Sequence, residues 1–251
     1  MALIDPDLLL RAYAIGVFPM SDGRDAPEVY WVEPRRRAIL PIDRFHLSRS
    51  LRKTLRSGRF TVTLDTAFAQ VIRRCAERPE TWINAEIEQS YVDLYARGHA
   101  HSVEVWEQGE LVGGLYGVRL GTAFFGESMF SSATDASKVA LAWLVARLRA
   151  GGFRLLDCQF MTDHLRSLGA IEISQSDYLS LLSAELDGVA ALLPAGGEAL
   201  ARGESAGRGT ARRAGVPAFG ALELLLSDPS GASVPPAEAG CVISQLLVST
   251  S

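Results

Sequence analysis

The chain has 251 residues, of which 48% are hydrophobic and 22% are charged, as is typical of a soluble globular protein with a substantial core. No apolar run approaches the ~20 residues that a transmembrane helix needs. The N-terminus also lacks the features of a signal peptide, so we expect a cytoplasmic protein with no membrane partner. The three cysteines lie far apart, which argues against a disulfide framework or a paired-cysteine metal site.

The net charge of −4 argues weakly against a nucleic-acid partner, but the charge is unevenly distributed. Between Arg35 and Arg59 the chain has nine basic residues and a single acid, Asp43. Local charge steers a polyanion more than total charge does, so this segment is a candidate nucleic-acid surface. The nine residues are Arg35, Arg36, Arg37, Arg44, Arg49, Arg52, Lys53, Arg56 and Arg59.

The first half of the chain alternates short helices with short strands. Asp5 is a candidate N-cap and Pro6 suits the first turn of a helix over residues 5–16. Ser48 is a candidate N-cap for a second helix, which reaches about Ser57. The further elements that we expect are strands at 29–32 and 60–64 and helices at 66–76 and 84–97.

The predicted helix after Ser48 has leucines on one side and basic residues on the other, since residues step by ~100° around a helix. An isolated face of this kind is most often a solvated surface. A binding site for a polyanion is the alternative. We define the basic face by its four residues, Arg49, Arg52, Lys53 and Arg56.

The second half begins with an antiparallel meander, in which residues 107–110 form the first hairpin turn. A long helix follows, capped at Thr134 or Asp135 and ended by Gly151 and Gly152. The expected elements are strands at 100–106, 111–118 and 122–125, a helix at 134–149, a strand at 153–156 and a helix at 177–186.

This order predicts a mixed α/β (α+β) fold, with helices packed on a mixed sheet. We expect a small N-terminal α+β domain at 1–64 and the main domain at 65–186. Residues 187–251 are rich in Gly, Ala, Ser and Pro, and 187–239 is expected to be largely flexible, with a helix at 218–226. The apolar run 242–248 is expected to form a terminal strand.

Asp157 and Gln159 end the strand that begins at Phe153. Side chains alternate along a strand, so both should point the same way, with Cys158 on the other side. A carboxylate beside an amide can hold that amide in one orientation. This pattern favours a site where the amide accepts a hydrogen bond from a substrate.

Glu127 stands in the apolar run that ends at Phe130, where an unpaired carboxylate is costly to bury. It either forms an internal salt bridge or provides a socket for a cationic substrate group beside an apolar pocket. The glycine-rich stretch 113–117 lies inside a predicted strand, which favours close backbone packing or a β-bulge over a phosphate loop.

Two further residue types are ambiguous. Trp82 precedes a predicted helix and could stack on a nucleobase, although a partly buried tryptophan is commoner. His99 and His101 share one face of a strand without a third ligand nearby, so we expect no metal site.

Together these segments resemble the leucyl/phenylalanyl-tRNA–protein transferase family over about residues 5 to 186. The resemblance implies a GNAT-like acyltransferase fold with a small N-terminal domain, and no cofactor. It implies transfer of Leu or Phe, less often Met, from aminoacyl-tRNA to the N-terminal Arg or Lys of a protein, which marks that protein for N-degron proteolysis. The matching stretches include residues 13–20, 31–35, 46–50, 81–83, 98–106, 111–118, 126–131, 136–138, 156–159 and 167–170.

The resemblance also implies roles for individual residues. Gln159 orients and helps to deprotonate the acceptor amine, and Asp157 polarises the Gln159 amide. Glu127 neutralises the acceptor's cation. The remaining implied residues are Tyr13 and Tyr91 near the acceptor, Leu115, Phe124 and Met129 in the aminoacyl side-chain pocket, Trp82 and Met20 near the terminal adenosine, and the basic face on the tRNA acceptor arm.

Three other functions remain alternatives: a related aminoacyl-tRNA-dependent transferase with a different donor, a CoA-dependent acetyltransferase, and a non-catalytic RNA-binding module. Acetyltransferases of this fold hold the pyrophosphate with a glycine-containing loop before the main helix, and residues 131–136 do not supply one. We expect a monomer.

Overall fold

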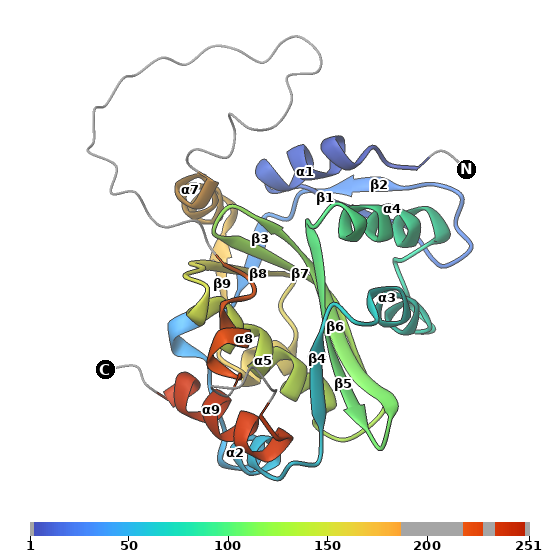
Figure 1. Cartoon of the computed structure of the whole chain (residues 1–251). Coiled ribbons are helices and arrows are strands. Elements are labelled where there is room, and N and C mark those ends of the chain that lie inside the picture. The colour runs from blue at the N-terminus through green and yellow to red at the C-terminus, as the bar shows by residue number, and fades with distance from the viewer. Residues whose placement is uncertain (1–2, 187–217, 228–233, 249–251) are drawn as a thin grey trace.

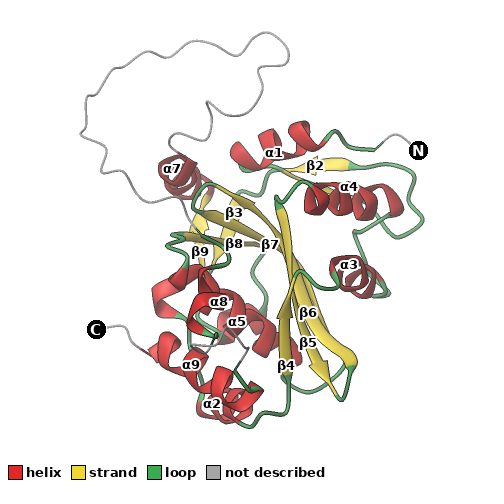
Figure 2. Cartoon of the chain, viewed as in Figure 1, coloured by secondary structure: helices red, strands yellow, loops and turns green. Residues whose placement is uncertain are grey.

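The computed structural model describes residues 3–186, 218–227 and 234–248 (Figure 1). Its centre is a seven-stranded mixed sheet with helices on both faces, and a two-stranded sheet lies beside it (Figure 2). The predicted mixed α/β architecture is confirmed. No helix of the described residues is long and apolar enough to cross a bilayer.

The large sheet has the strand order β4-β5-β6-β7-β8-β3-β9. All neighbours are antiparallel except β7 and β8, which are parallel and connected by helix α5 (Ala136–Ala150). The strands are β3 (Arg36–Ile39), β4 (Thr61–Leu64), β5 (Ala100–Glu107), β6 (Glu110–Leu120), β7 (Ala123–Ser131), β8 (Leu155–Gln159) and β9 (Ile171–Ser174), and the small sheet pairs β1 (Phe18–Met20) with β2 (Tyr30–Val32).

Two hydrophobic cores lie on opposite faces of the sheet, because side chains alternate along each strand. On β6, for example, Leu115 belongs to one core and Tyr116 to the other. The first core contains α5 and the helices α2 (Arg49–Arg56), α8 (Ala221–Leu225) and α9 (Pro236–Val248), and the second contains α1 (Pro6–Ala14), α3 (Phe68–Ala76), α4 (Ala85–Ala96) and α7 (Gln175–Leu186).

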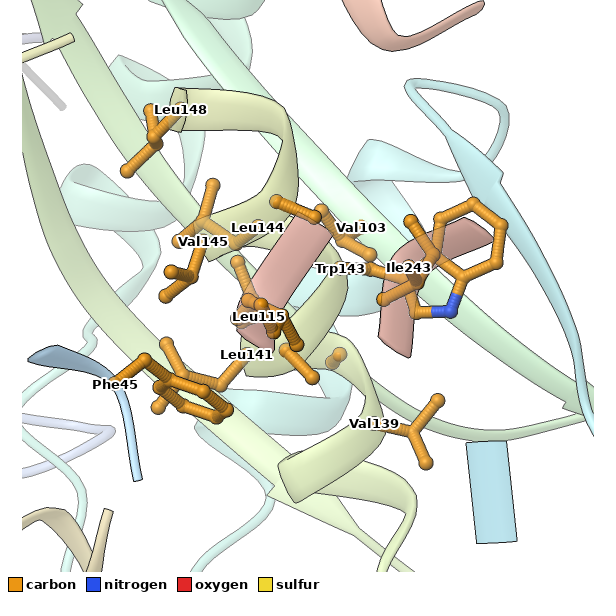
Figure 3. Packing of buried hydrophobic residues seen from close by; sticks show 14 of the residues in the cluster. Phe45, Val103, Leu115, Val139, Leu141, Trp143, Leu144, Val145, Leu148 and Ile243 are labelled. Carbon is orange, nitrogen blue, oxygen red and sulfur yellow. The ribbon is translucent and has the colours of Figure 1, made fainter. Parts of the chain in front are cut away.

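Helix α5 is buried on nearly all sides because it lies between the sheet and the other helices of its core. Figure 3 shows Leu141 and Leu144 of α5 packed with Val103 and Leu115 of the sheet and with Ile243 of α9. The sheet approaches the start of α5 closely at β6. The missing side chain of Gly113 permits this, since a Cβ there would lie 2.6 Å from the Cβ of Ala136.

The C-terminal segment differs from its prediction. The helix expected within 218–226 is confirmed as α8, but the strand expected at 242–248 is wrong, because these residues belong to helix α9. Ile243 and Leu247, one helical turn apart, are buried in the α5 core. The expected flexibility of 187–239 stays a prediction, and 187–217 and 228–233 lie outside the described part of the chain.

Most elements predicted from periodicity are present within a few residues of their expected ends. The expected strand at 153–156 instead covers Leu155–Gln159, so Asp157 lies inside the sheet. β1, β3 and β9 were not predicted. The domain boundary at residue 64 stays a prediction, and β3 and β4, which precede it, belong to the same sheet as β5 to β9.

Candidate active site

A cavity of about 610 Å³ opens where β7 and β8 stop pairing. The two strands pair only from Ala123 to Phe125 and from Leu155 to Asp157, although β7 continues to Ser131. The gap beyond the last pair leaves room between the strand ends. Residues that line the cavity include Arg74, Arg78, Trp82, Leu115, Glu127, Met129, Leu141, Leu144, Leu156, Cys158, Gln159, His164 and Leu165.

A β-bulge presents Glu127 to this cavity. Tyr116 pairs with Ser128 and Gly117 pairs with Gly126, so Glu127 is the extra residue of the bulge. The backbones are so close here that a Cβ on Gly117 would lie 2.2 Å from the carbonyl oxygen of Phe125. The interpretation of the glycine stretch as close packing and a bulge is confirmed.

Glu127 is buried and accepts three hydrogen bonds from neutral groups. Its Oε1 accepts from the Tyr13 hydroxyl at 2.6 Å and from Gln159 Nε2 at 2.7 Å, and its Oε2 accepts from the Tyr91 hydroxyl at 3.0 Å. The two tyrosine hydroxyls also lie within hydrogen-bonding distance of each other, although each has a single hydrogen, which it donates to Glu127. Burial raises the pKa of Glu127 to about 7, against the lowering effect of these hydrogen bonds.

No Lys, Arg or His in the described part of the chain forms an ion pair with Glu127. The internal salt bridge considered from the sequence is therefore not the arrangement found. A buried carboxylate without a cation, at the wall of a cavity, is suited to receive a cation from a ligand.

Asp157 has the opposite environment, because it is fully buried and paired with a cation. Arg37 donates to it from Nε at 2.9 Å and 3.1 Å and from Nη2 at 2.5 Å, and the Tyr178 hydroxyl donates at 2.9 Å. The Arg37 guanidinium lies between the rings of Phe18 and Tyr178 and donates to the Gly16 carbonyl at 2.9 Å. The Asp157 carboxylate is thus held rigidly and neutralised below the cavity.

The predicted contact between Asp157 and the Gln159 carboxamide is wrong. Asp157 Oδ1 accepts instead from the backbone N–H of Gln159 at 2.8 Å, and Gln159 adopts a left-handed φ of 61°. This backbone conformation interrupts the regular alternation at the strand end. Gln159 and Cys158 therefore both line the cavity, whereas Asp157 does not.

The apolar part of the cavity agrees only partly with the prediction. Leu115 and Met129 line it, but Phe124 does not, because its ring is buried and stacks on Phe219 at 5.4 Å between centroids. The side chains missed from the sequence come from α5, β8 and the short helix α6 (Asp163–Ser167): Leu141, Leu144, Leu156 and Leu165.

Trp82 is half-buried and also lines the cavity, so the structural and the ligand-binding interpretations of this residue are compatible. Its carbonyl accepts from the backbone N–H of Ser21 at 3.1 Å. Met20, the residue before Ser21, packs against the second core with Trp82 and is not among the residues that line the cavity.

The basic face lies on α2, which begins after the predicted N-cap Ser48. All four of its residues are exposed, and none forms an ion pair within the described residues. Three other members of the basic segment form ion pairs elsewhere: Arg36 pairs with Glu172 at 3.0 Å, Arg37 is buried on Asp157, and Arg59 pairs with Glu107 at 2.7 Å. The candidate polyanion surface is therefore smaller than the nine predicted residues.

Comparison with known proteins decides the family. A family model described as leucyl/phenylalanyl-tRNA protein transferase matches residues 39–183, and the model of the N-terminal domain of the same family matches residues 3–35. The chain belongs to this family. It is 61% identical to a leucyl/phenylalanyl-tRNA–protein transferase from Rhizorhabdus wittichii over the whole of both chains. With the transferase from Novosphingobium aromaticivorans it is 55% identical over 99% of this chain and 97% of the relative.

The transferase moves an aminoacyl group from aminoacyl-tRNA to the N-terminus of a protein, as its family does. Among solved structures, FemX is similar at a TM-score of 0.45 and 13% identity, over 66% of each chain. The residues that sequence reasoning missed, Arg37 and Tyr178, are 120 and 21 positions from Asp157. Arg37 stands in a basic run that gave no sign of its burial.

Proposed function

We propose that the cavity is the transfer site, where a leucyl or phenylalanyl group, less often methionyl, passes from the tRNA 3′ end to an N-terminal Arg or Lys. The main support for this proposal is the hydrogen bond between Gln159 and Glu127, because it connects a carboxylate that can bind a cation to a carboxamide held in a fixed orientation. The product carries a destabilising N-terminus for N-degron proteolysis. The donor implies action in the cytoplasm, and we propose that the transferase acts as a monomer.

The aminoacyl side chain occupies the apolar end of the cavity, against Leu115, Met129 and the four leucines of α5, β8 and α6. Phe124 supports this pocket from behind through its stacking on Phe219. Trp82 stacks on the terminal adenine, a contact that contributes ~1–3 kcal/mol per base in single-strand binding. Met20 supports that region of the second core. The basic face on α2 contacts the tRNA acceptor arm.

The acceptor's cationic side chain binds Glu127, which has no cation of its own in the described structure. Tyr13 and Tyr91 donate hydrogen bonds to the same carboxylate and fix its position. A Lys or Arg side chain would pair with a charge that is otherwise costly to bury. The energy of that pairing selects basic N-terminal residues.

In the reaction, the acceptor α-amine attacks the ester carbonyl, the new C–N bond forms and the C–O bond to the ribose breaks. Gln159 Nε2 is held by Glu127, which aims Oε1 of the same carboxamide at the amine. Asp157 fixes the Gln159 backbone from below. The ester is already activated, so positioning supplies most of the rate.

The amine proton leaves toward the ribose oxygen that the ester releases, directly or through water. Asp157 is a poor destination because Arg37 and Tyr178 already occupy it with hydrogen bonds. A neutral carboxamide is a very weak base. Gln159 therefore acts by orienting the amine.

The deciding experiment is a transfer assay with leucyl-tRNA and a peptide that starts with Arg. Wild type should transfer, and Gln159→Ala should lose transfer while it keeps tRNA affinity. Equal transfer by the two proteins would reject the site and favour a non-catalytic RNA-binding module. A panel of other aminoacyl-tRNAs tests the alternative of a different donor.

A further inference from the structure

Arg78 is a cation at the cavity wall without an acidic partner in the described part of the chain. It lies in the connection between α3 and α4 and is one of the residues that line the cavity. Its neighbour in the cavity, Arg74, is paired with Glu77 at 3.0 Å. No carboxylate of the described residues forms an ion pair with Arg78, which donates only to the Ser128 hydroxyl, at a long 3.4 Å.

The position of Arg78 is unfavourable for the acceptor. Arg78, Ser128 and Glu127 all line the same cavity, so an acceptor cation bound at Glu127 would share that cavity with the guanidinium. A second cation at this wall repels a basic N-terminus. An arginine here is better explained by an anion that the other substrate brings.

The donor carries such an anion next to the group that Trp82 would bind. Trp82 and Arg78 belong to the same α3–α4 connection, four positions apart, and both line the cavity. In an aminoacyl-tRNA the terminal adenosine carries the aminoacyl ester on its ribose. The 5′ oxygen of the same adenosine carries the phosphate that links the last two nucleotides. An adenine against Trp82 leaves this phosphate as the first negative charge along the donor.

We propose that Arg78 forms a subsite for the phosphate that joins the terminal adenosine of the donor to the preceding nucleotide. This subsite rests on the proposed function. Arginine recognises phosphate through parallel N–H donors, which makes it suited to fix the register of the strand. The bound phosphate also neutralises Arg78, so the donor prepares the cavity for a cationic acceptor.

Two ligands isolate this contact. Both carry phenylalanine in a stable amide linkage on the 3′ position of adenosine, and only one has a 5′-phosphate. Calorimetry with wild type should give roughly tenfold tighter binding of the phosphorylated ligand, as a partly exposed charge-assisted contact predicts. In Arg78→Ala this preference should disappear, while affinity for the unphosphorylated ligand stays within about twofold.

Arg73→Ala is the matched control, because Arg73 lies on α3, is exposed and does not line the cavity. It removes the same charge and should keep the preference for phosphate. Equal affinity of wild type for the two ligands, or an unchanged preference in Arg78→Ala, would overturn the subsite. Wild type that binds neither ligand would count against the proposed donor site itself, and the subsite would fall with it.

Discussion

Glu127→Gln should stabilise the free protein at alkaline pH while it damages acceptor binding. Burial raises the pKa of Glu127 from an ordinary 4.5 to about 7. Between these values the folded state binds more protons than the unfolded state, so stability falls as pH rises through the window. About 2.5 pKa units at 1.36 kcal/mol each give a loss of about 3 kcal/mol.

The substituted carboxamide has no such titration and can keep the hydrogen bonds. Its oxygen can accept from Tyr13 and Gln159, as Oε1 of Glu127 does, and its NH₂ can donate to the Tyr91 hydroxyl. The Tyr91 hydroxyl, released from Glu127, can then donate to the Tyr13 oxygen, which already lies within hydrogen-bonding distance. The variant therefore removes a charge without leaving a buried group unsatisfied.

Urea unfolding at about pH 5 and about pH 8 measures the effect. The free energy of unfolding of wild type should fall relative to Glu127→Gln by about 2.5 kcal/mol between the two conditions, since part of the window lies below pH 5. The exposed Glu110→Gln, on the neighbouring hairpin, controls for the general change in charge. Parallel pH curves for wild type and Glu127→Gln would refute the reasoning that Glu127 is buried without a cation.

Glu127→Gln should also transfer less efficiently to a basic N-terminus, although it is the more stable protein at alkaline pH. Loss of a charge-assisted contact predicts a roughly ten- to hundredfold lower kcat/KM for a peptide that starts with Arg. Affinity for aminoacyl-tRNA should stay close to that of wild type, because the proposed donor contacts do not include this carboxylate. Unchanged preference for Arg and Lys in a peptide panel would remove Glu127 from the acceptor site.

Three other groups of variants test the surroundings of the site. Asp157→Ala should lower the free energy of unfolding by about 3–5 kcal/mol because it leaves Arg37 buried and unpaired. In urea unfolding, the double variant Arg37→Met with Asp157→Leu should lose less stability than the sum of the losses from Arg37→Met alone and Asp157→Leu alone. Additive losses would argue against a coupled pair. Gly117→Ala should distort the bulge and lower kcat/KM for the acceptor peptide. Gly23→Ala is the control, because its added methyl meets nothing within 4 Å, and it should leave kcat/KM unchanged. Equal activities of the two variants would show that the bulge tolerates a side chain. Replacement of the four residues of the basic face by Gln should raise the KM for aminoacyl-tRNA. The slope of log affinity for tRNA against log salt concentration should become shallower by ~0.7–0.9 for each phosphate that is no longer neutralised. An unchanged slope would make this face a solvated surface.

Periodicity predicted the regular elements because burial on one face leaves a local pattern in the sequence. The meander follows this rule, and the capping residues Asp5 and Ser48 mark real helix starts. Helix α5 is buried on nearly all sides, and its candidate cap and terminal glycines indicated it instead. The prediction for the terminal segment 242–248 failed because a short apolar run fits a strand or a helix equally well. Its helical state depends on packing against α2 and α5, which no local pattern records.

The site was predictable in its residue types but not in its contacts. Asp157, Gln159 and Glu127 stood out because polar groups in apolar runs need partners. Their partners come from distant segments: Glu127 bonds Tyr13, 114 positions earlier, and Gln159, 32 positions later. A local rule assigned Asp157 to the carboxamide of Gln159 because the left-handed backbone at Gln159 was invisible to strand alternation.

The carboxylates of Asp157 and Glu127 therefore have different environments, and these environments support different proposed roles. Asp157 is paired with Arg37 and accepts from the backbone N–H of Gln159, so it holds the end of β8 in place. Glu127 has only neutral donors, so its charge is costly until a cation arrives. In the mechanism that we propose, an acceptor that brings this cation also completes the contact network that aims Gln159. Under that proposal, recognition of the basic residue and alignment of the attacking amine take place at the same carboxylate.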